Sequence, residues 1–361
     1  MKLAILGAGN GGVAMAADWA IHGHEVSLFD FKKFGTQINA INKNDGIYVE
    51  GAMEGFVKIK YAGFSIEEAL NGAEMIAIVG PAYSTKAFAQ VIKPVIKKGQ
   101  HIIVCPGSIG GGLIVKNELG LSYDDDSIIV AETSTLPYAA RNIEPGHVHM
   151  YNRLKGGLYI SALPMNKSEF IKEKFDQIYN AFKLSNNYFQ TMLQNANPVI
   201  HPAVSLLNAG RIDDPNASFL FYEEGVTPHV GRLIESVDIE RIKIGKALGV
   251  DIVPDPVLGV EQGYMIEDNY ESGYRTAPGF KGVEAQSQLD HRYINEDVGY
   301  GLVFMKELAE KLDVETPIID SVINIASVVM KRNYRNEHKR SLESLGLNKF
   351  TAEELFNNFK K

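Results

Sequence analysis

The first thirty residues hold the feature that most constrains this fold. An apolar strand, a glycine-rich turn, a helix and a second strand follow one another without interruption. The turn reads Gly7-Ala8-Gly9-Asn10-Gly11-Gly12 and has the spacing GxGxxG. In such a unit the first glycine permits the tight turn, the second lets a pyrophosphate approach the backbone, and the third lets the helix pack closely on the sheet. Unpaired amides at the helix start would bind the phosphates. The segment therefore predicts a dinucleotide-binding unit.

Asp30 ends the second strand, at the expected distance after Gly12. A carboxylate there accepts hydrogen bonds from the two ribose hydroxyls and repels a 2′-phosphate, which favours NAD over NADP. Lys32 and Lys33 follow, however, and could reach a 2′-phosphate, so NADP stays open. Glycine-rich turns also occur as purely structural loops. The flanking strand and helix and the acidic residue favour the dinucleotide.

Length and charge exclude several classes of protein. A chain of 361 residues predicts two domains. The formal charge of −8 gives no overall basic field, so we expect no nucleic-acid partner. One cysteine, Cys105, excludes an internal disulfide and a cysteine-based zinc cluster, and fits a cytoplasmic protein. No apolar stretch is long enough for a membrane span, and we expect no metal.

Strands alternating with helices through the first part of the chain predict an α/β fold with a parallel, doubly wound sheet. We expect a β-ribbon at 46–50 and 55–59, strands at 74–79, 101–104 and 128–131, and helices at 32–42 and 84–97. Ligands bind at the carboxyl ends of such strands, so Pro81 and Ala82 are candidate cofactor contacts. A hairpin is expected at 147–153 and 157–162, followed by a helix at 169–182.

The pattern changes in the second half of the chain. From about residue 190 apolar residues recur at three and four spacing, as in 238–248, which predicts an all-helical domain. We therefore expect a dinucleotide-binding domain at 1–184 and a helical domain at 185–361. His229 is expected in a loop, and 270–282 in a long ordered loop that could serve as a lid.

A nicotinamide cofactor implies hydride transfer, which needs a proton donor nearby. Asn197 and His201 lie four apart on one helical face, and Pro198 and Pro202 are expected to break the helix at either side. Histidine titrates near ~6.5, so it can give and take a proton near neutrality. The alternative is a histidine that only satisfies hydrogen bonds in the core.

A charged cluster at 290–301 is the second candidate site. Arg292 could hold a substrate carboxylate through two hydrogen bonds, and Asp297 could orient a histidine. Such runs are also common as solvated helix faces. The stretch 132–141, with Thr135 and Tyr138 as candidate substrate contacts, could form a site loop or a structural turn.

Six segments in this order resemble the opine dehydrogenases of the octopine and nopaline type over nearly the whole chain. They are GAGNGG at 7–12, ETSTLPYAAR at 132–141, NPVIHP at 197–202, FYEEGVTPHV at 221–230, VDIERIKIGKALGV at 237–250 and HRYINEDVGYGLV at 291–303. The resemblance implies that His201 and Asp297 form a catalytic dyad, that Asn197 is an active-site residue and that Arg292 holds a substrate carboxylate. It implies reduction, by NAD(P)H, of an imine formed from an amino acid and a 2-oxo acid. We also expect a homodimer.

Two alternatives remain open from the sequence. A 2-oxo or 3-hydroxy acid reductase of related architecture would need no amine substrate, and a nucleotide-sensing protein would keep the fold without catalysis. Gly299 stands where the family pattern has proline, and this departure close to Asp297 could loosen the dyad.

Overall fold

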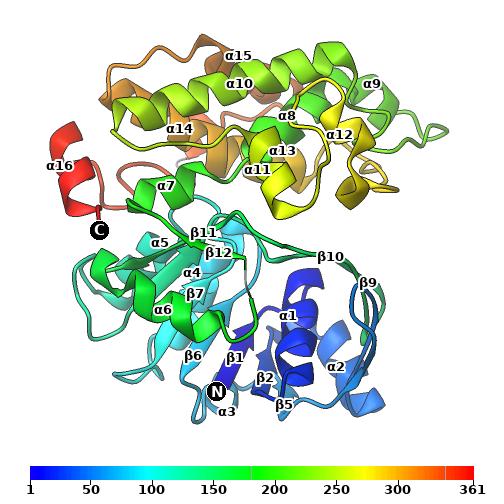
Figure 1. The fold of residues 1–361 in the computed structure, drawn as a ribbon, viewed down its shortest axis with the longest axis vertical. Helices are drawn as coiled ribbons and strands as arrows, with labels where there is room; N and C mark the ends of the chain where they lie inside the picture. Colours follow the sequence, from blue (N-terminus) through cyan, green and yellow to red (C-terminus); the bar gives the residue numbers. More distant parts are fainter. Residues whose placement is uncertain (180, 338) are drawn as a thin grey trace. The chain divides into compact units, whose positions relative to one another are not determined.

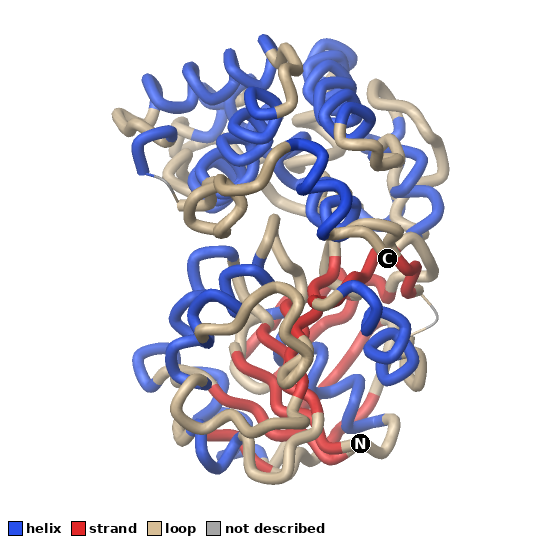
Figure 2. The backbone as a smooth tube through the Cα atoms, turned by 90° about the vertical axis from the view of Figure 1, so that its left-hand side faces the viewer, coloured by secondary structure: helices blue, strands red, loops and turns tan. Residues whose placement is uncertain are grey.

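The computed structural model describes residues 1–179, 181–337 and 339–361, and these form two compact units. The first unit comprises Met1–Leu154 and Leu158–Leu184, and the second comprises Lys155–Gly157 and Ser185–Lys361. Figure 2 shows that the strands belong to the first unit, whereas the second is built from helices and loops. Within the described residues, no helix is both long and apolar enough to cross a membrane.

The main sheet of the first unit has the strand order β12-β11-β8-β7-β6-β1-β2-β5. Its strands are β1 (Lys2–Leu6), β2 (Glu25–Phe29), β5 (Tyr61–Gly63), β6 (Met75–Ile78), β7 (His101–Val104), β8 (Val130–Thr133), β11 (Leu158–Leu163) and β12 (Phe182–Leu184). The order runs outward from β1 in both directions, so the doubly wound sheet is confirmed, with its switch point between β1 and β6. β11 pairs antiparallel with β8 and parallel with β12, so these two strands at one end of the sheet run opposite to the other strands.

Helices cover this sheet on both faces, as Figure 1 shows. They are α1 (Asn10–Ile21), α2 (Thr36–Asn44), α3 (Ile66–Ala69), α4 (Thr85–Ile92), α5 (Gly111–Leu119) and α6 (Ser168–Phe175), with short 3₁₀ turns η1 (Lys32–Phe34), η2 (Ala82–Ser84) and η3 (Met165–Lys167). Strand residues such as Ala4, Ile76 and Ile102 are fully buried in one core cluster with Phe88 and Ile92 of α4. Strands buried on both faces read as continuous apolar runs, which is the pattern in this sequence.

A second, four-stranded sheet has the order β4-β3-β10-β9. It contains β3 (Ile47–Gly51), β4 (Gly55–Val57), β9 (Tyr138–Glu144) and β10 (His147–Arg153). The β-ribbon of β3 and β4 is confirmed. The hairpin expected between 147–153 and 157–162 is wrong, because β10 turns back onto β9 through Pro145 and Gly146, and Gly146 has a left-handed φ of 78°.

Two expected helices of the first unit are shorter than predicted. The helix expected at 169–182 ends at Phe175, and Phe182 begins β12; residue 180 lies outside the described part of the chain. The helix expected at 84–97 ends at Ile92, two residues before Pro94. Proline lacks the amide that would continue the helix, and it pushes the residue before it away from helical geometry.

The second unit is helical, as expected. Its helices are α7 (Tyr188–Leu193), α8 (Asn197–Leu207), α9 (Ala209–Ile212), α10 (Pro228–Ala247), α11 (Asp255–Gln262), α12 (Gly273–Thr276), η4 (Pro278–Phe280), α13 (Arg292–Glu296), η5 (Asp297–Leu302), α14 (Val303–Lys311), α15 (Pro317–Val329), η6 (Arg335–Glu337) and α16 (Ala352–Asn358). The long helix α10 packs against α7, α8, α14 and α15. It begins at Pro228, so His229 lies in its first turn and not in a loop. The loop expected at 270–282 contains α12 and η4.

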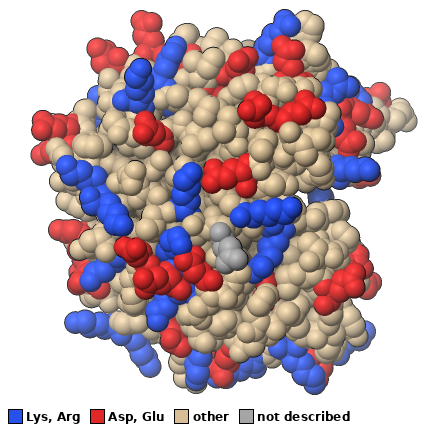
Figure 3. All heavy atoms as spheres, in the orientation of Figure 1, with Lys and Arg blue, Asp and Glu red and all other residues tan. Residues whose placement is uncertain are grey.

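Charged side chains of both signs are mixed on the face of the molecule that is drawn in Figure 3. On the face drawn in Figure 3, basic and acidic side chains of the described residues alternate within each unit. This distribution fits the small net negative charge of the sequence.

Candidate functional site

The glycine turn joins β1 to α1, and each of its three motif glycines has a distinct environment. Gly7 has a φ of +112°, and a Cβ on it would lie 2.1 Å from the Val79 carbonyl oxygen. A Cβ on Gly12 would lie 1.7 Å from the Gly7 carbonyl oxygen, whereas a Cβ on Gly9 would meet nothing within 4 Å. The fold itself therefore requires Gly7 and Gly12. Gly9 instead borders open space at the start of α1, where no side chain caps the helix amides. These features fit a bound pyrophosphate.

Asp30 follows β2 and is almost completely buried. Its Oδ2 accepts a hydrogen bond from the Ala8 amide in the glycine turn (2.8 Å), and its Oδ1 accepts one from the Phe31 amide (2.7 Å). Burial raises the pKa of this carboxyl, against the two amide hydrogen bonds, which lower it. Asp30 thus ties β2 to the turn. The ribose contact expected for it stays a prediction.

Pro81 and Ala82 follow β6 and lie next to the glycine turn, since Val79 closely approaches Gly7. Thr135 follows β8 and is half-buried. All of these residues therefore belong to the carboxyl edge of the sheet, where a ligand is expected.

Tyr138 has a different environment from the one expected of a substrate contact. Its side chain is buried, and its hydroxyl donates to Asp18 Oδ2 on α1 (2.7 Å) and contacts the Tyr179 hydroxyl. Both Asp18 and Tyr179 are themselves buried. The Tyr138 hydroxyl is therefore occupied inside the first unit, and the proposed site does not include this residue. Glu132, in the same stretch, is also buried and accepts from the Gly112 amide at the start of α5 (2.8 Å).

In the second unit, α8 and η5 bring His201 and Asp297 together. The Nδ1 atom of His201 lies 2.8 Å from Asp297 Oδ2, and the two residues are only 3% and 6% exposed. A carboxylate accepts, so Nδ1 carries the proton and Nε2 of the neutral ring is an acceptor. His201 stacks on Tyr293, with 4.0 Å between ring centroids. Pro202 does not break the helix as expected but lies inside α8.

Asp297 begins η5, a π-helical stretch between α13 and α14. Such stretches are rare and often occur at functional sites, because the extra residue in the turn redirects a side chain. Gly299 lies in this stretch, and a Cβ on it would come within 3.2 Å of the Tyr334 ring. The His201–Asp297 hydrogen bond forms with glycine at this position.

Tyr222 completes the surroundings of His201. Its hydroxyl lies 3.1 Å from His201 Nε2, and its ring stacks on Phe280 of η4, with 4.1 Å between centroids. Burial raises the pKa of this phenol well above its ordinary value. Sequence reasoning noted the segment around Tyr222 but gave this residue no role. The only available signal was its place in the motif FYEEGVTPHV.

Arg292 and Asn197 flank the His201–Asp297 pair along their helices. The Arg292 side chain, in the first turn of α13, is 47% exposed and lies 3.7 Å from Glu296. It can therefore offer guanidinium N–H groups to a ligand. Asn197 begins α8, one turn before His201, and its backbone N–H donates to Asn195 Oδ1 (3.1 Å).

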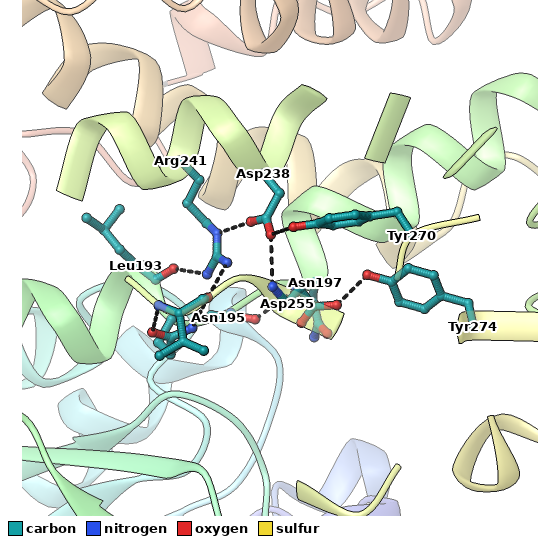
Figure 4. Close-up of polar contacts among 10 residues, drawn as sticks. Leu193, Asn195, Asn197, Asp238, Arg241, Asp255, Tyr270 and Tyr274 are labelled. Atoms are coloured by element: carbon teal, nitrogen blue, oxygen red, sulfur yellow. Dashed lines mark hydrogen bonds and ion pairs between the residues drawn. The ribbon is translucent and has the colours of Figure 1, made fainter. Parts of the chain in front are cut away.

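A buried polar network, drawn in Figure 4, holds the segments that lead into α8 and η4. Its side chains are Asp238, Arg241, Asp255, Tyr270 and Tyr274. Arg241 donates to Asp238 Oδ1 (2.6 Å) and to the carbonyls of Leu193 (2.6 Å) and Val253 (3.0 Å). Leu193 ends α7 just before α8, so α10 fixes the approach to His201 through Arg241.

The same network holds the chain that carries Phe280. Tyr270 donates to Asp238 Oδ2 (2.6 Å), and Tyr274 donates to Asp255 Oδ2 (2.5 Å). Residues 270–280 are therefore anchored to α10 and α11. This anchoring agrees with an ordered segment, and its role as a lid stays a prediction.

Replacing Asp255 with asparagine is expected to stabilise the protein more at pH 7.5 than at pH 5. Burial, with the nearby Asp238 charge, raises the pKa of Asp255 to about 6, above the ~3.9 of an unfolded chain. The charged carboxylate therefore destabilises the fold above pH 6, and this cost falls as the pH drops toward 4. Asparagine does not titrate. Thermal melts of both proteins across this range measure the difference, and a difference independent of pH would contradict the raised pKa.

Comparisons with known proteins agree with both units. Residues 184–330 match the family described as NAD/NADP octopine/nopaline dehydrogenase, alpha-helical domain, and residues 2–111 match NAD-dependent glycerol-3-phosphate dehydrogenase N-terminus. The chain is 34% identical to opine dehydrogenase of Arthrobacter sp. (strain 1C), covering 97% of this chain and 96% of that one. It is 27% identical to protein ocs of Agrobacterium tumefaciens (strain Ach5), covering 96% and 95%.

Solved structures give the same fold. An octopine dehydrogenase with NADH and L-arginine superposes with a TM-score of 0.80 at 20% identity, covering 100% of this chain and 99% of that one. A D-mandelate dehydrogenase with NADH and anilino(oxo)acetate gives a TM-score of 0.64 at 16% identity, covering 93% and 99%. At these identities the likeness concerns the fold alone.

Proposed function

The chain belongs to the opine dehydrogenase family, and from this premise we propose that His201 and Asp297 are the acid–base pair of its reaction. Enzymes of this family are NAD(P)-dependent oxidoreductases acting on CH–NH groups, and they condense an amino acid with a 2-oxo acid reductively. The observation that supports the assignment is the buried 2.8 Å hydrogen bond between His201 Nδ1 and Asp297. It fixes the tautomer and directs Nε2 away from the carboxylate, as general acid–base catalysis requires.

Three further residues receive proposed roles in the reaction. Arg292 holds the carboxylate of the 2-oxo acid, because its half-exposed guanidinium can form two parallel hydrogen bonds. Asn197, one helical turn from His201, positions the condensing groups. Thr135, at the carboxyl edge of the first unit's sheet, contacts the substrate.

The cofactor is a nicotinamide dinucleotide, NAD with NADP as an alternative. The turn Gly7-Ala8-Gly9-Asn10-Gly11-Gly12 would hold the pyrophosphate of the cofactor, and Asp30 would hold its ribose. Pro81 and Ala82 would lie near its nicotinamide. When bound and reduced, it supplies the hydride. Protonated His201 donates a proton to the oxygen that leaves as water when the imine forms, and Asp297 stabilises the positive charge that the imidazole carries before this transfer. Beside this proton transfer, positioning and charge neutralisation carry most of the protein's part of catalysis.

The substrates are proposed by class. Solved octopine dehydrogenases have been described with L-arginine, with agmatine and with pyruvate. For this chain we propose a small 2-oxo acid such as pyruvate and an amino acid as the two substrates. The amine partner depends on side chains that line its pocket, so the proposal names the class only.

A matrix of amino acids against 2-oxo acids tests this function. NADH or NADPH oxidation, followed by absorbance, is expected to require both substrates, because the imine forms only from the pair. Mass spectrometry should then find an N-(carboxyalkyl) amino acid as product. Equal rates with the 2-oxo acid alone, and a 2-hydroxy acid as product, would instead support the reductase alternative.

We propose that the protein is a cytoplasmic homodimer. Its one cysteine, Cys105, is buried and forms no internal disulfide, which fits a reducing compartment. Ile325, Val328 and Val329 lie at i, i+3 and i+4 on α15 and are 53%, 78% and 47% exposed. Such an apolar stripe is suited to self-association with a second copy.

The change Val328→Glu is expected to convert the dimer into a monomer, because it puts two charges against each other at a two-fold interface. Light scattering coupled to gel filtration measures the mass. The matched control is Val257→Glu on α11, where the valine is 42% exposed. A monomeric unmodified protein, or a dimer that survives Val328→Glu, would reject this interface.

A further inference from the structure

We propose that Tyr222 is a catalytic residue that relays the proton between His201 and the substrate oxygen. This inference rests on the proposed function, since it takes His201 as the proton source. It places Tyr222, to which the sequence gave no role, between His201 and the substrate in the proton path.

The surroundings of His201 leave one atom for proton exchange. Nδ1 is engaged by Asp297, the ring stacks on Tyr293, and the edge of Phe221 lies 5.8 Å away between centroids. The whole residue is only 3% exposed. Nε2 is therefore the nitrogen that must exchange the proton, and the Tyr222 hydroxyl lies 3.1 Å from it.

A phenol can perform both halves of a relay. Its oxygen accepts a hydrogen bond while its O–H donates another, so it can receive from Nε2–H and give to a substrate oxygen together. Burial keeps the pKa of Tyr222 well above the ordinary value, so the group stays neutral and passes a proton without holding a charge. A deprotonated phenolate is not needed at any point.

Arg292, the proposed holder of the oxo-acid carboxylate, lies close to the aromatic neighbours of His201. The positive charge of Arg292 acts on the Tyr222 hydroxyl and lowers its pKa, against the larger effect of burial. The Arg292 guanidinium also lies 5.6 Å from the centroid of the Tyr293 ring, which stacks on His201. If Arg292 holds the carboxylate, the oxygen on the adjacent carbon is brought toward Tyr222.

Two protons move in this relay when the carbinolamine loses water. The Nε2–H bond of protonated His201 breaks as an O–H bond forms on Tyr222. The original O–H proton of Tyr222 passes to the departing hydroxyl, the C–O bond breaks, and water leaves. The nitrogen lone pair forms the C=N bond. His201 ends neutral, Tyr222 is unchanged, and the imine nitrogen carries the positive charge until hydride reduces the carbon.

Tyr222→Phe isolates the hydroxyl, because phenylalanine keeps the ring that stacks on Phe280 at 4.1 Å. We expect kcat to fall roughly 10²-fold, as for loss of a general acid, with NADH affinity unchanged. The matched control is Tyr264→Phe. The Tyr264 ring also stacks on Phe280, with 5.2 Å between centroids. Its hydroxyl is not in the proton path, because the partners of the two ring nitrogens of His201 are Asp297 and Tyr222. This control is expected to keep the unmodified kcat.

Single-turnover rates in mixtures of H₂O and D₂O separate a relay from a structural role. With two protons in flight, the rate of the unmodified enzyme should depend on the deuterium fraction along a curve. Tyr222→Phe should give a straight line, because one proton then moves. An unchanged kcat in Tyr222→Phe, or a slow variant whose curve keeps its shape, overturns the relay. Full activity in His201→Asn overturns the acid–base pair itself, so the two failures are distinguishable.

Discussion

The substitution His201→Asn is expected to lower kcat/KM for the condensation by about 10²–10⁴-fold, which is the contribution of a positioned general acid. Asparagine can still donate an amide hydrogen toward Asp297, so the buried carboxylate keeps a partner. It cannot supply or accept a proton near neutrality. Steady-state kinetics with saturating NADH measure the loss, and fluorescence titration of NADH should give an unchanged Kd, because the glycine turn lies in the other unit.

His229→Asn provides the matched control for this prediction. His229 lies in the first turn of α10 in the same unit, and it is exposed. Its substitution should leave kcat/KM unchanged. If both histidine variants retain activity within tenfold, His201 is a core histidine with satisfied hydrogen bonds, and the proton donor must be sought elsewhere. A parallel loss of NADH affinity in His201→Asn would indicate a structural effect.

The sequence predicted the elements whose spacing carries a direct physical requirement. Gly7 and Gly12 are needed because a Cβ on either would collide with backbone oxygen, and this requirement appears in the motif itself. His201 and Asp297 are far apart in the chain. Taken alone, His201 was as easily explained as a core histidine, and Asp297 as part of a solvated helix face. Their joint assignment came from the order of six segments, and the structure places the two side chains 2.8 Å apart.

Other features could not be predicted because they depend on contacts between distant segments. Tyr138 follows a strand at the ligand edge, yet its side chain faces Asp18 and Tyr179 within the first unit, a choice set by how β9 packs on α1. The pairing of β10 with β9 depends on the turn at Pro145 and Gly146. These two residues are a turn signal in the sequence, and they indicate a hairpin between the strands on either side of them. Tyr222 meets His201 only through the folding of the segment between α9 and α10.

The substitution Arg241→Leu is expected to destabilise the second unit by about 3–5 kcal/mol, because it leaves the Asp238 carboxylate buried without its positive partner. Asp238 and Arg241 are both 0% exposed, and the guanidinium also holds the carbonyls at the end of α7 and before α11. Those carbonyls would lose their donors as well. Urea unfolding followed by circular dichroism at 222 nm reports the helices, most of whose residues lie in this unit, while the single tryptophan, Trp19, reports the first unit by fluorescence.

Arg232→Leu on the same helix is the matched control. Its side chain is 62% exposed and pairs with a half-exposed Glu271, so its loss should change stability by about 0–1 kcal/mol. In Arg241→Leu the circular dichroism midpoint should fall while the Trp19 midpoint changes less, since the buried charge lies in the second unit. Adding Asp238→Leu should recover part of the loss, because the uncompensated charge is then removed. Equal effects of Arg241→Leu and Arg232→Leu would mean that water or a neighbouring group stabilises Asp238, and that α10 does not fix the approach to α8 through Arg241.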